Sequence, residues 1–400
     1  MLQAGVEVMA RATGHLPASA GPVRLLFVLP SLGGGGAERA SVDILRGIHR
    51  DKFRVSLALF SCSGSFLPQV PTDVRVHDLH GGPQNDLRLV WHLATLLRRE
   101  QPAIVLSVLR YANLVALLAR RLSGSRARVV INEQNLPSAE FAQFGGGAVK
   151  GLAMRWLYPG ADRIAAISRG IARELTSRYG VPDDRVRVIH NPVDLDRVRA
   201  LAAEPPGHPW LQPTPFQAAR RYPLVVGVGR LHPQKGFAHL IRAFARVRKT
   251  RPCNLIILGE GPERANLERL IAELGLRDDV ALPGFHANPY SVMRHANLFV
   301  LSSLYEGFGN VLVEALALGT PVISTRCPVG PDEIITDGVH GLLVPPGDDG
   351  ALAQAILRAL ADDELRRRLS ANGPARASDF ALENIVDQYE SEFAQLAGGV

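Results

Sequence analysis

The sequence is poor in cysteine and has no long apolar run, and each shortage excludes a class of protein. Its three cysteines, Cys62, Cys253 and Cys327, are odd in number and far apart, without the spacing of metal ligands. We therefore expect a reducing cytoplasm, no disulfide framework and no zinc site. No stretch of about 18 apolar residues is present, so no transmembrane helix is expected.

A targeting segment and repeated or low-complexity tracts are also lacking. Glu7 and Arg11 fall where a signal peptide needs its apolar core, so residues 1–22 are interpreted as a loose extension. The remaining chain is longer than one hydrophobic core usually serves. Two domains are therefore expected.

Positive charge is concentrated in the first half of the chain. Residues 1–200 contain 26 Lys and Arg against 16 Asp and Glu, whereas residues 201–400 contain 19 against 22. A basic first half suits peripheral contact with an anionic membrane, on the inner face of the cytoplasmic membrane, or attraction of an acidic substrate; a solvated Arg-rich face is the alternative. No nucleic-acid partner is expected, because no aromatic-plus-basic motif accompanies the charge.

Buried strands alternate with helical segments along the whole chain. One series begins at residues 24–30 and ends at 186–189, and a second begins at 224–229 and ends at 341–344. This alternation predicts an α/β protein with two Rossmann-like, doubly wound parallel-sheet domains. The cleft between them is the expected active site, at the carboxyl ends of the strands.

Composition places the domain boundaries. Six prolines between residues 203 and 223 predict a linker region over 201–222. The first domain is then expected over 23–200 and the second over 223–379. Apolar residues at helical spacing predict a final helix within 380–400.

A glycine run, residues 33–36, follows the first strand and precedes a helical pattern. Backbone amides in such a turn approach a ligand closely. The dinucleotide fingerprint is absent, however, because the glycines are consecutive and the second strand ends in Phe60 and Ser61 without an acidic residue. A nicotinamide enzyme is therefore disfavoured.

Two carboxylates bracket the most informative stretch, residues 302–320. A buried strand, a glycine-rich loop and a helix are predicted, with Glu306 in the loop and Glu314 in the first turns of the helix. Free amides at the helix start suit a sugar or a phosphate. Glu314 stands among apolar residues and is predicted to meet a ligand hydroxyl or a specific partner. The alternative for Glu306 is a solvated charge at a helix start.

Two cations, Arg230 and Lys235, lie on the loop 229–236 between a strand and a helix. Cations beside a helix amino terminus predict a diphosphate site, with a solvated pair of side chains as the alternative. The turns at 259–263 and 283–285 are predicted to line a slot for a flat base, although ordinary turn chemistry would also account for them.

In combination, these motifs resemble the retaining glycosyltransferases of family 4, the group 1 glycosyltransferases, which have the GT-B fold. The resemblance extends over roughly residues 23–395. The segments that carry it are G-x-L-x-x-x-K-G at 229–236, E-x7-E at Glu306 and Glu314, G-E-G-P at 259–262, N-P-V-D at 191–194, G-G-A-E-R at 35–39, and the tail at 330–345.

The resemblance implies transfer of a hexose or N-acetylhexosamine, with retention, from a nucleotide diphosphate sugar. A UDP-sugar donor and a glycan or lipid-linked glycan acceptor in surface polysaccharide or lipopolysaccharide synthesis are implied. Arg230 and Lys235 would hold the diphosphate and stabilise the charge of the leaving group. Glu306 would orient the donor sugar, and Glu314 would accept hydrogen bonds from the ribose. No cofactor and no metal are implied, since the two cations replace a metal.

The resemblance also assigns residues outside these four. The C-terminal helix would cross back onto the first domain. Many relatives have a histidine in the polar loop that here reads Asn132-Glu133-Gln134-Asn135, so Glu133 or Gln134 would take over its contact, and Glu133 is a weak catalytic candidate. The donor site implied comprises Gly34, Gly35, Gly229, Arg230, Lys235, Gly259, Gly261, Phe285, Glu306, Gly307, Phe308, Gly309, Asn310, Val311, Leu312 and Glu314.

Three further interpretations remain beside this one. Asp194 and Asp196 spell D-x-D, but they follow N-P-V in the expected hinge and are interpreted as turn chemistry. A catalytically silent subunit that binds nucleotide sugars is favoured by the missing histidine, although the carboxylate pair weighs against it. A GT-B-like epimerase or phosphorylase is the alternative enzyme.

Overall fold

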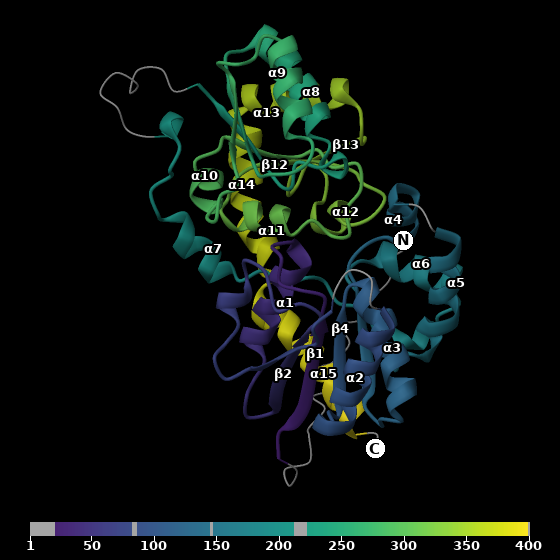
Figure 1. Cartoon of the computed structure of the whole chain (residues 1–400). Helices are drawn as coiled ribbons and strands as arrows, with labels where there is room; N and C mark the ends of the chain where they lie inside the picture. Colours follow the sequence, from purple (N-terminus) through teal and green to yellow (C-terminus); the bar gives the residue numbers. More distant parts are fainter. Residues whose placement is uncertain (1–20, 82–85, 145–146, 212–221, 399–400) are drawn as a thin grey trace, which may run out of the picture.

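A computed structural model describes residues 21–81, 86–144, 147–211 and 222–398. Most of the predicted N-terminal extension, and residues 212–221 of the predicted proline-rich linker, lie outside the described residues. The described chain forms two α/β domains stacked end to end (Figure 1). This arrangement confirms the predicted fold class. No helix in the described ranges is both long and apolar enough to cross a membrane.

Seven parallel strands form the sheet of the first domain, in the order β3-β2-β1-β4-β5-β6-β7. They are Val23–Leu29 (β1), Phe53–Leu59 (β2), Arg75–Asp78 (β3), Ile104–Val108 (β4), Arg128–Glu133 (β5), Arg163–Ala166 (β6) and Val186–Val188 (β7). The helices between them are Gly36–Gly47 (α1), Asp86–Glu100 (α2), Arg110–Ser123 (α3), Pro137–Phe144 (α4), Gly147–Leu157 (α5) and Arg169–Tyr179 (α6).

Both faces of this sheet are buried, as its unbroken apolar strands predict. Successive side chains of a strand point to opposite faces. In β1, Leu26 and Val28 therefore join the core beneath α2 and α3, whereas Leu25 and Phe27 join a second core beneath α1.

Six parallel strands form the second sheet, in the order β10-β9-β8-β11-β12-β13. They are Leu224–Val228 (β8), Asn254–Leu258 (β9), Val280–Gly284 (β10), Leu298–Leu301 (β11), Val322–Thr325 (β12) and Leu342–Val344 (β13). The helices are Phe237–Thr250 (α8), Arg264–Glu273 (α9), Tyr290–Arg294 (α10), Asn310–Ala317 (α11), Pro331–Ile334 (α12), Asp349–Ala361 (α13) and Asp363–Ser378 (α14).

The chain passes between the domains twice, and the two crossing segments pair with each other. Val193 N donates to the carbonyl of Phe380 at 3.0 Å, and Leu382 N donates to the carbonyl of Val193 at 3.1 Å. Helix α7 (Leu195–Ala202) then packs on α10 and α11 of the second domain. The chain therefore leaves the first domain soon after β7, whereas the composition placed this boundary at residue 200.

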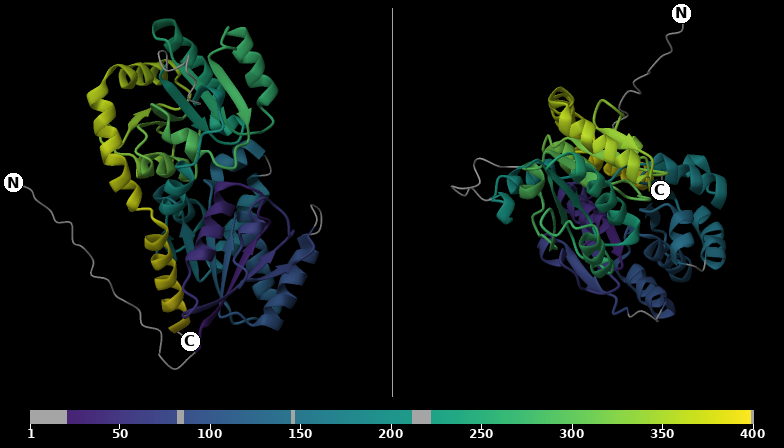
Figure 2. Two further views of the ribbon diagram at one scale, coloured as in Figure 1. Left: turned by 90° about the vertical axis from the view of Figure 1, so that its left-hand side faces the viewer. Right: turned by 90° about the horizontal axis from the view of Figure 1, so that it is seen from above.

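The last helix, α15 (Leu382–Gly398), lies along the first domain (Figure 2). Its buried side chains complete the core beneath α1, where the ring of Phe393 meets Phe53 edge-on at 5.8 Å. The hydroxyl of Tyr389 accepts a hydrogen bond from Asn132 Nδ2 at 2.7 Å. The final helix is thus part of the first domain's core although it follows the second domain in sequence.

Replacing Phe393 with alanine tests that role of α15. The ring is fully buried, so Phe393→Ala should lower the free energy of unfolding by about 3–5 kcal/mol. Phe285→Ala is the matched control, because Phe285 is 64% exposed, and it should change stability by less than about 0.5 kcal/mol. Urea unfolding followed by circular dichroism measures both. Equal stability of the two variants would show that α15 is only loosely attached.

Candidate active site

The sequence order of the strands reverses at one place in each sheet. In the first sheet, β2 and β3 lie on one side of β1, and β4 lies on its other side. In the second sheet, β9 lies on one side of β8, and β11 lies on its other side. Consecutive connections diverge at such a point, so a ligand site forms there at the carboxyl ends of the strands. A ligand site is therefore expected at the reversal point of each sheet.

In the second domain, β8 and β11 bring the loops 229–236 and 302–309 together. The hydroxyl of Ser302 donates to the carbonyl of Lys235 at 2.9 Å, and Leu304 N donates to the carbonyl of Gln234 at 2.8 Å. These bonds fix the relative position of two loops that lie far apart in sequence.

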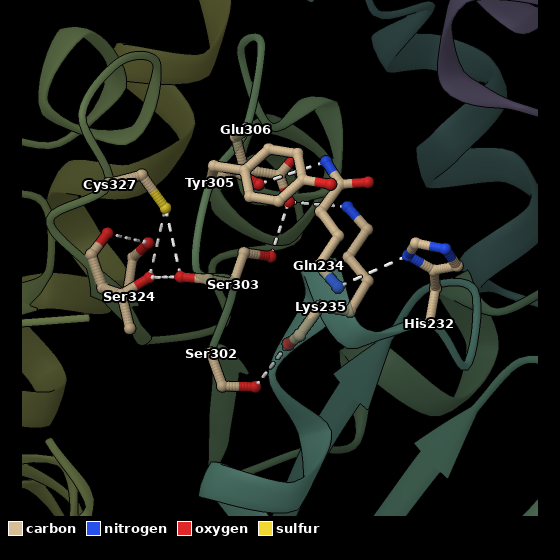
Figure 3. Close-up of polar contacts among 10 residues, drawn as sticks. His232, Gln234, Lys235, Ser302, Ser303, Tyr305, Glu306, Ser324 and Cys327 are labelled. Carbon is tan, nitrogen blue, oxygen red and sulfur yellow. Dashed lines mark hydrogen bonds and ion pairs between the residues drawn. The ribbon is translucent and has the colours of Figure 1, made fainter. Parts of the chain in front are cut away.

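An ion pair joins the two loops. Lys235 Nζ lies 2.6 Å from Glu306 Oε1, and the hydroxyl of Ser303 donates to the same oxygen at 2.6 Å (Figure 3). The side chains of Lys235 and Glu306 are only 16% and 7% exposed, so solvent screens the pair weakly. Within the described part of the chain, Oε2 of Glu306 has no hydrogen-bond partner and is available to a ligand.

Ser303 is held by two residues from the neighbouring strand β12 and the loop after it. Its carbonyl accepts hydrogen bonds from Thr325 Oγ1 and from Cys327 Sγ, the latter at 3.2 Å. Burial raises the pKa of the Cys327 thiol to about 12, so the thiol keeps its proton and donates. Sequence reasoning missed Ser303; its place three residues before Glu306 was the available signal.

The turn 259–263 supports the loop that carries Arg230. Leu231 N donates to the carbonyl of Glu260 at 2.8 Å. A Cβ on Gly259 would lie 1.8 Å from the carbonyl oxygen of Gly229, and one on Gly261 would lie 2.3 Å from that of Leu231. These glycines therefore permit backbone packing behind Gly229.

Two large side chains of the expected donor site are exposed. Arg230 makes no side-chain hydrogen bond or ion pair with any residue that the structure describes, and its guanidinium is open to solvent. Phe285, at the end of β10, is 64% exposed. Both side chains are thus accessible to a ligand at this edge of the sheet.

The loop after β11 also contacts the first domain. A Cβ on Gly307 would lie 2.0 Å from the carbonyl oxygen of Gln134, so only glycine fits where the two domains meet. Asn310 Nδ2 donates to the carbonyl of Gly36 at 3.4 Å, and Asn191 Nδ2 donates to Asn310 Oδ1 at 3.2 Å. The carboxyl ends of the two sheets therefore face each other.

These contacts place the predicted glycine loop of the first domain opposite the start of α11. Gly34 has φ 122°, and Gly35 precedes the first residue of α1. On the other side, Gly309 precedes α11 with φ 105°. The first amides of α11 lack partners within their own helix, so they are suitable donors to an anion or a hydroxyl.

Other residues of the predicted donor site have inward-facing side chains. The Phe308 ring is 1% exposed and packs against the rings of His190 and Phe380, with centroids 5.0 and 5.3 Å apart. Leu312 is fully buried, and Val311 is partly buried. The side chains of Phe308 and Leu312 are thus directed into the protein and not toward a donor.

Glu314 lies among groups from both domains. The Tyr290 hydroxyl donates to its Oε1 at 3.1 Å. Burial raises the pKa of Glu314 to about 7, an effect that Arg39 of α1 and Arg197 of α7 oppose and Asp43 of α1 reinforces. Tyr290 is therefore a specific partner of the kind expected for this carboxylate.

Asp43 is the second carboxylate of this cluster. It is 3% exposed, and its burial raises its pKa to about 6. The nearest cation, Arg197 Nη1, is 3.9 Å from Asp43 Oδ1. No pattern in the sequence marks this cluster, because its members come from four separate helices.

Glu133 is engaged inside the first domain. It is 1% exposed; its Oε1 accepts from Arg110 Nη2 at 3.1 Å, and its Oε2 accepts from the Tyr158 hydroxyl at 2.6 Å. Arg110 also pairs with Glu140 at 3.0 Å, and the preceding residue, Leu109, has a φ of 76°. With both oxygens occupied, this geometry does not favour the catalytic role expected for Glu133.

Potential metal ligands do not gather at this site in the described residues. Asp194 Oδ1 caps α7 by accepting from Arg197 N at 2.9 Å, and Asp196 is exposed, which agrees with turn chemistry. The one group of described residues with metal-like spacing contains His49 and Glu390, where Lys52 Nζ already binds Glu390 at 2.9 Å.

The chain is similar to known proteins in both sequence and fold. A model of group 1 glycosyl transferases matches residues 212–376, and a glycosyltransferase family 4 model matches residues 34–197. The chain is 31% identical to N-acetylgalactosamine-N,N'-diacetylbacillosaminyl-diphospho-undecaprenol 4-alpha-N-acetylgalactosaminyltransferase of Campylobacter jejuni, over 91% of this chain and 97% of that protein.

Solved structures share the fold. The Anabaena protein HepE in complex with UDP superposes with a TM-score of 0.75 at 24% identity, over 94% of this chain and all of that one. The lipopolysaccharide outer core galactosyltransferase WaaB superposes with a TM-score of 0.70 at 21% identity, over 93% of this chain and all of that one. At these identities, the similarity shows the fold alone.

Replacing Ser303 tests the geometry of Glu306. Ser303→Ala removes one hydrogen bond to a carboxylate, which is typically worth about 1.5–3 kcal/mol. We expect turnover to fall by about 10-fold to 100-fold. Ser61→Ala, an exposed serine, is the control. Steady-state kinetics measures both variants, and unchanged turnover in Ser303→Ala would show that Glu306 does not depend on this contact.

The raised pKa of Glu314 predicts a pH-dependent stability. Because this pKa is about 7 when folded against an ordinary 4.5, the folded state binds the proton more tightly than the unfolded chain. The stabilising contribution is therefore present below pH 4.5 and is lost as pH rises through about 7. Glu314→Gln stays neutral, so it should raise the Tm by about 2–4 °C more at pH 8 than at pH 5.

Asp196→Asn is the matched control for that measurement, because Asp196 is an exposed carboxylate. Its Tm difference from the wild type should not depend on pH. A pH-independent difference for Glu314→Gln as well, in thermal unfolding of the ligand-free protein, would contradict the raised pKa.

Proposed function

Because this chain belongs to the group 1 and family 4 glycosyltransferases, we propose that it transfers a hexose or N-acetylhexosamine from a UDP-sugar to a lipid-linked glycan, with retention, in surface polysaccharide synthesis. The observation that carries the proposal is the ion pair of Lys235 and Glu306 at the reversal point of the second sheet. The activity for which the Campylobacter relative is named supports the acceptor class, and the UDP complex of HepE supports the nucleotide.

In this proposal, Lys235 and Arg230 stabilise the departing diphosphate. Negative charge builds on that group as its bond to the sugar breaks, and preorganised cations lower the energy of the transition state. Lys235 is held in place by Glu306, whereas the exposed Arg230 is accessible to the phosphates. Two cations can supply this charge without a bound metal, so we propose a metal-independent reaction.

Glu306 and Glu314 would divide the recognition of the donor. Glu306 Oε1 is fixed by Lys235 and Ser303, which leaves Oε2 to accept hydrogen bonds from the hydroxyls of the donor sugar. Glu314 Oε1 is bound by Tyr290, which leaves the other oxygen to the ribose. The first amides of α11, between the two carboxylates, would add hydrogen bonds to the same ligand.

The acceptor would approach from the first domain. Its facing edge contains the glycine loop 33–36 and the loop 132–135, both of which contact the second domain. The basic charge of residues 1–200 suits an acceptor carried in an anionic membrane. We therefore propose a peripheral location on the inner face of the cytoplasmic membrane.

Transfer assays with Lys235→Ala test the proposal. The variant should lose about 10²- to 10³-fold in kcat/KM for a UDP-sugar, the usual effect of removing one charge-stabilising group. Lys249→Ala, which removes an exposed lysine at the end of α8, should behave as the wild type. Activity should persist in EDTA, and the product should keep the anomeric configuration of the donor.

Three outcomes would contradict this function. Donor breakdown that requires inorganic phosphate would indicate a phosphorylase, and conversion of the donor without any acceptor would indicate an epimerase. UDP-sugar binding without turnover, across a panel of lipid-linked acceptors, would indicate the silent subunit.

A further inference from the structure

Helix α5 has an apolar outer face. Val149, Leu152 and Trp156 are 77%, 69% and 69% exposed, and their spacing places them on one side of the helix. The opposite side is apolar too, with Met154 and Leu157 buried. A helix at a water-exposed surface normally presents a polar face to solvent, whereas the outer face of α5 is apolar. We call Val149, Leu152 and Trp156 the α5 stripe.

One cation lies against the α5 stripe, and two more are exposed on the same helix. Lys150 and Arg155 are exposed on the same helix, and the guanidinium of Arg121, at the end of α3, lies 4.9 Å from the ring centre of Trp156. A tryptophan beside cations and aliphatic side chains has the composition of a protein surface at a lipid headgroup layer.

The surrounding chain lacks opposing charge. Between residues 101 and 161 the only acidic residues are Glu133 and Glu140. Glu133 is buried, and Glu140 pairs with Arg110. The same stretch contains seven Lys and Arg; Arg110, Arg120 and Arg128 are paired with acidic residues, and the other four leave an excess of positive charge. Such a surface attracts an anionic bilayer and is less suited to a neutral protein partner.

The α5 stripe is also connected directly to the acceptor side of the active site. The chain runs from β5 through Gln134, whose carbonyl meets Gly307, into α4 and then α5. Helix α4 lies beside the second domain, and α5 lies farther out on the edge of the first (Figure 1). A bilayer against α5 would therefore lie next to the entrance for a lipid-linked acceptor.

We propose that the α5 stripe docks the first domain on an anionic lipid bilayer, with Trp156 and Leu152 in the interfacial layer. Lys150, Arg155 and Arg121 then contact lipid phosphates. The proposal rests on the proposed function, because that function places the acceptor in such a membrane. The docking proposal adds which surface of the enzyme binds the membrane, and that this surface requires anionic lipid.

Vesicle flotation of the full chain tests the docking surface. The probes are vesicles of phosphatidylcholine alone and of phosphatidylcholine with phosphatidylglycerol. The wild type should bind the anionic vesicles, with binding that weakens as salt is added. Leu152→Ser/Trp156→Ser should bind them about tenfold more weakly or worse, and Lys150→Glu/Arg155→Glu should lose the preference for anionic lipid. Val339→Ser removes an exposed valine of the second domain and is the matched control.

UDP-glucose binding in solution, measured by thermal shift, separates this proposal from the function. Normal binding by all variants would show that they are folded and that only docking has changed. If the protein docked on vesicles but showed no transfer activity, the docking surface would be supported and the proposed transferase function would be overturned. Equal flotation of the wild type and Leu152→Ser/Trp156→Ser, or no flotation of the wild type, would overturn the docking surface.

Light scattering on size-exclusion fractions tests whether a second copy of the chain, and not a bilayer, covers the α5 stripe. A monomeric wild type agrees with the proposal. A dimer that Leu152→Ser/Trp156→Ser converts to a monomer would overturn it, because a second copy of the chain would then cover the stripe.

Discussion

The ion pair between Lys235 and Glu306 is the contact on which the candidate active site depends. It joins loops from neighbouring strands at the point where the sequence order of the sheet reverses. Because the pair is nearly enclosed, each charge requires the other, and a change at either residue leaves a buried charge without compensation. Ser303, held by Cys327 and Thr325, adds a second donor to the same oxygen. The Glu306 carboxylate is thus held by groups of the protein itself.

The second constraint is the contact between the domains. Gly307 lies against the backbone of Gln134, and Asn310 forms hydrogen bonds with both Gly36 and Asn191. The loop after β11 in the second domain therefore packs against the strand ends of the first domain. Two short crossing segments, paired at Val193, join the domains nearby. A ligand between the sheets would therefore touch elements of both domains, and the proposed division into donor and acceptor sides follows from that geometry.

The sequence predicted the fold well because its evidence is local. Each buried strand and the helix after it can be recognised from a few residues, and two such series give two parallel sheets. The carboxylates and cations of the proposed donor site were predicted for the same reason, since Glu306 and Lys235 lie in glycine-containing loops directly after strands. Their mutual contact depends on β8 and β11 being neighbours, which the order of the strands in the sequence does not state.

Contacts between distant segments could not be predicted. The partners of Glu133 are Arg110 and Tyr158, from two other helical segments, and they turn an apparently open polar loop into a buried network. Glu314 meets Tyr290 because α10 and α11 pack together within the second domain, and it meets the charges of α1 only because the domains pack together. The prolines after residue 203 placed the predicted domain boundary at residue 200, whereas the chain crosses between the domains near Val193. Composition indicates where loops lie but not which segments contact each other.

The most direct test of this account is a crystal structure of the chain with a UDP-sugar, soaked without metal. The account predicts the diphosphate within hydrogen-bond distance of Lys235 and Arg230, a sugar hydroxyl at Glu306 and the ribose at Glu314. A nucleotide bound elsewhere on the protein, or a diphosphate that contacts neither cation, would contradict it.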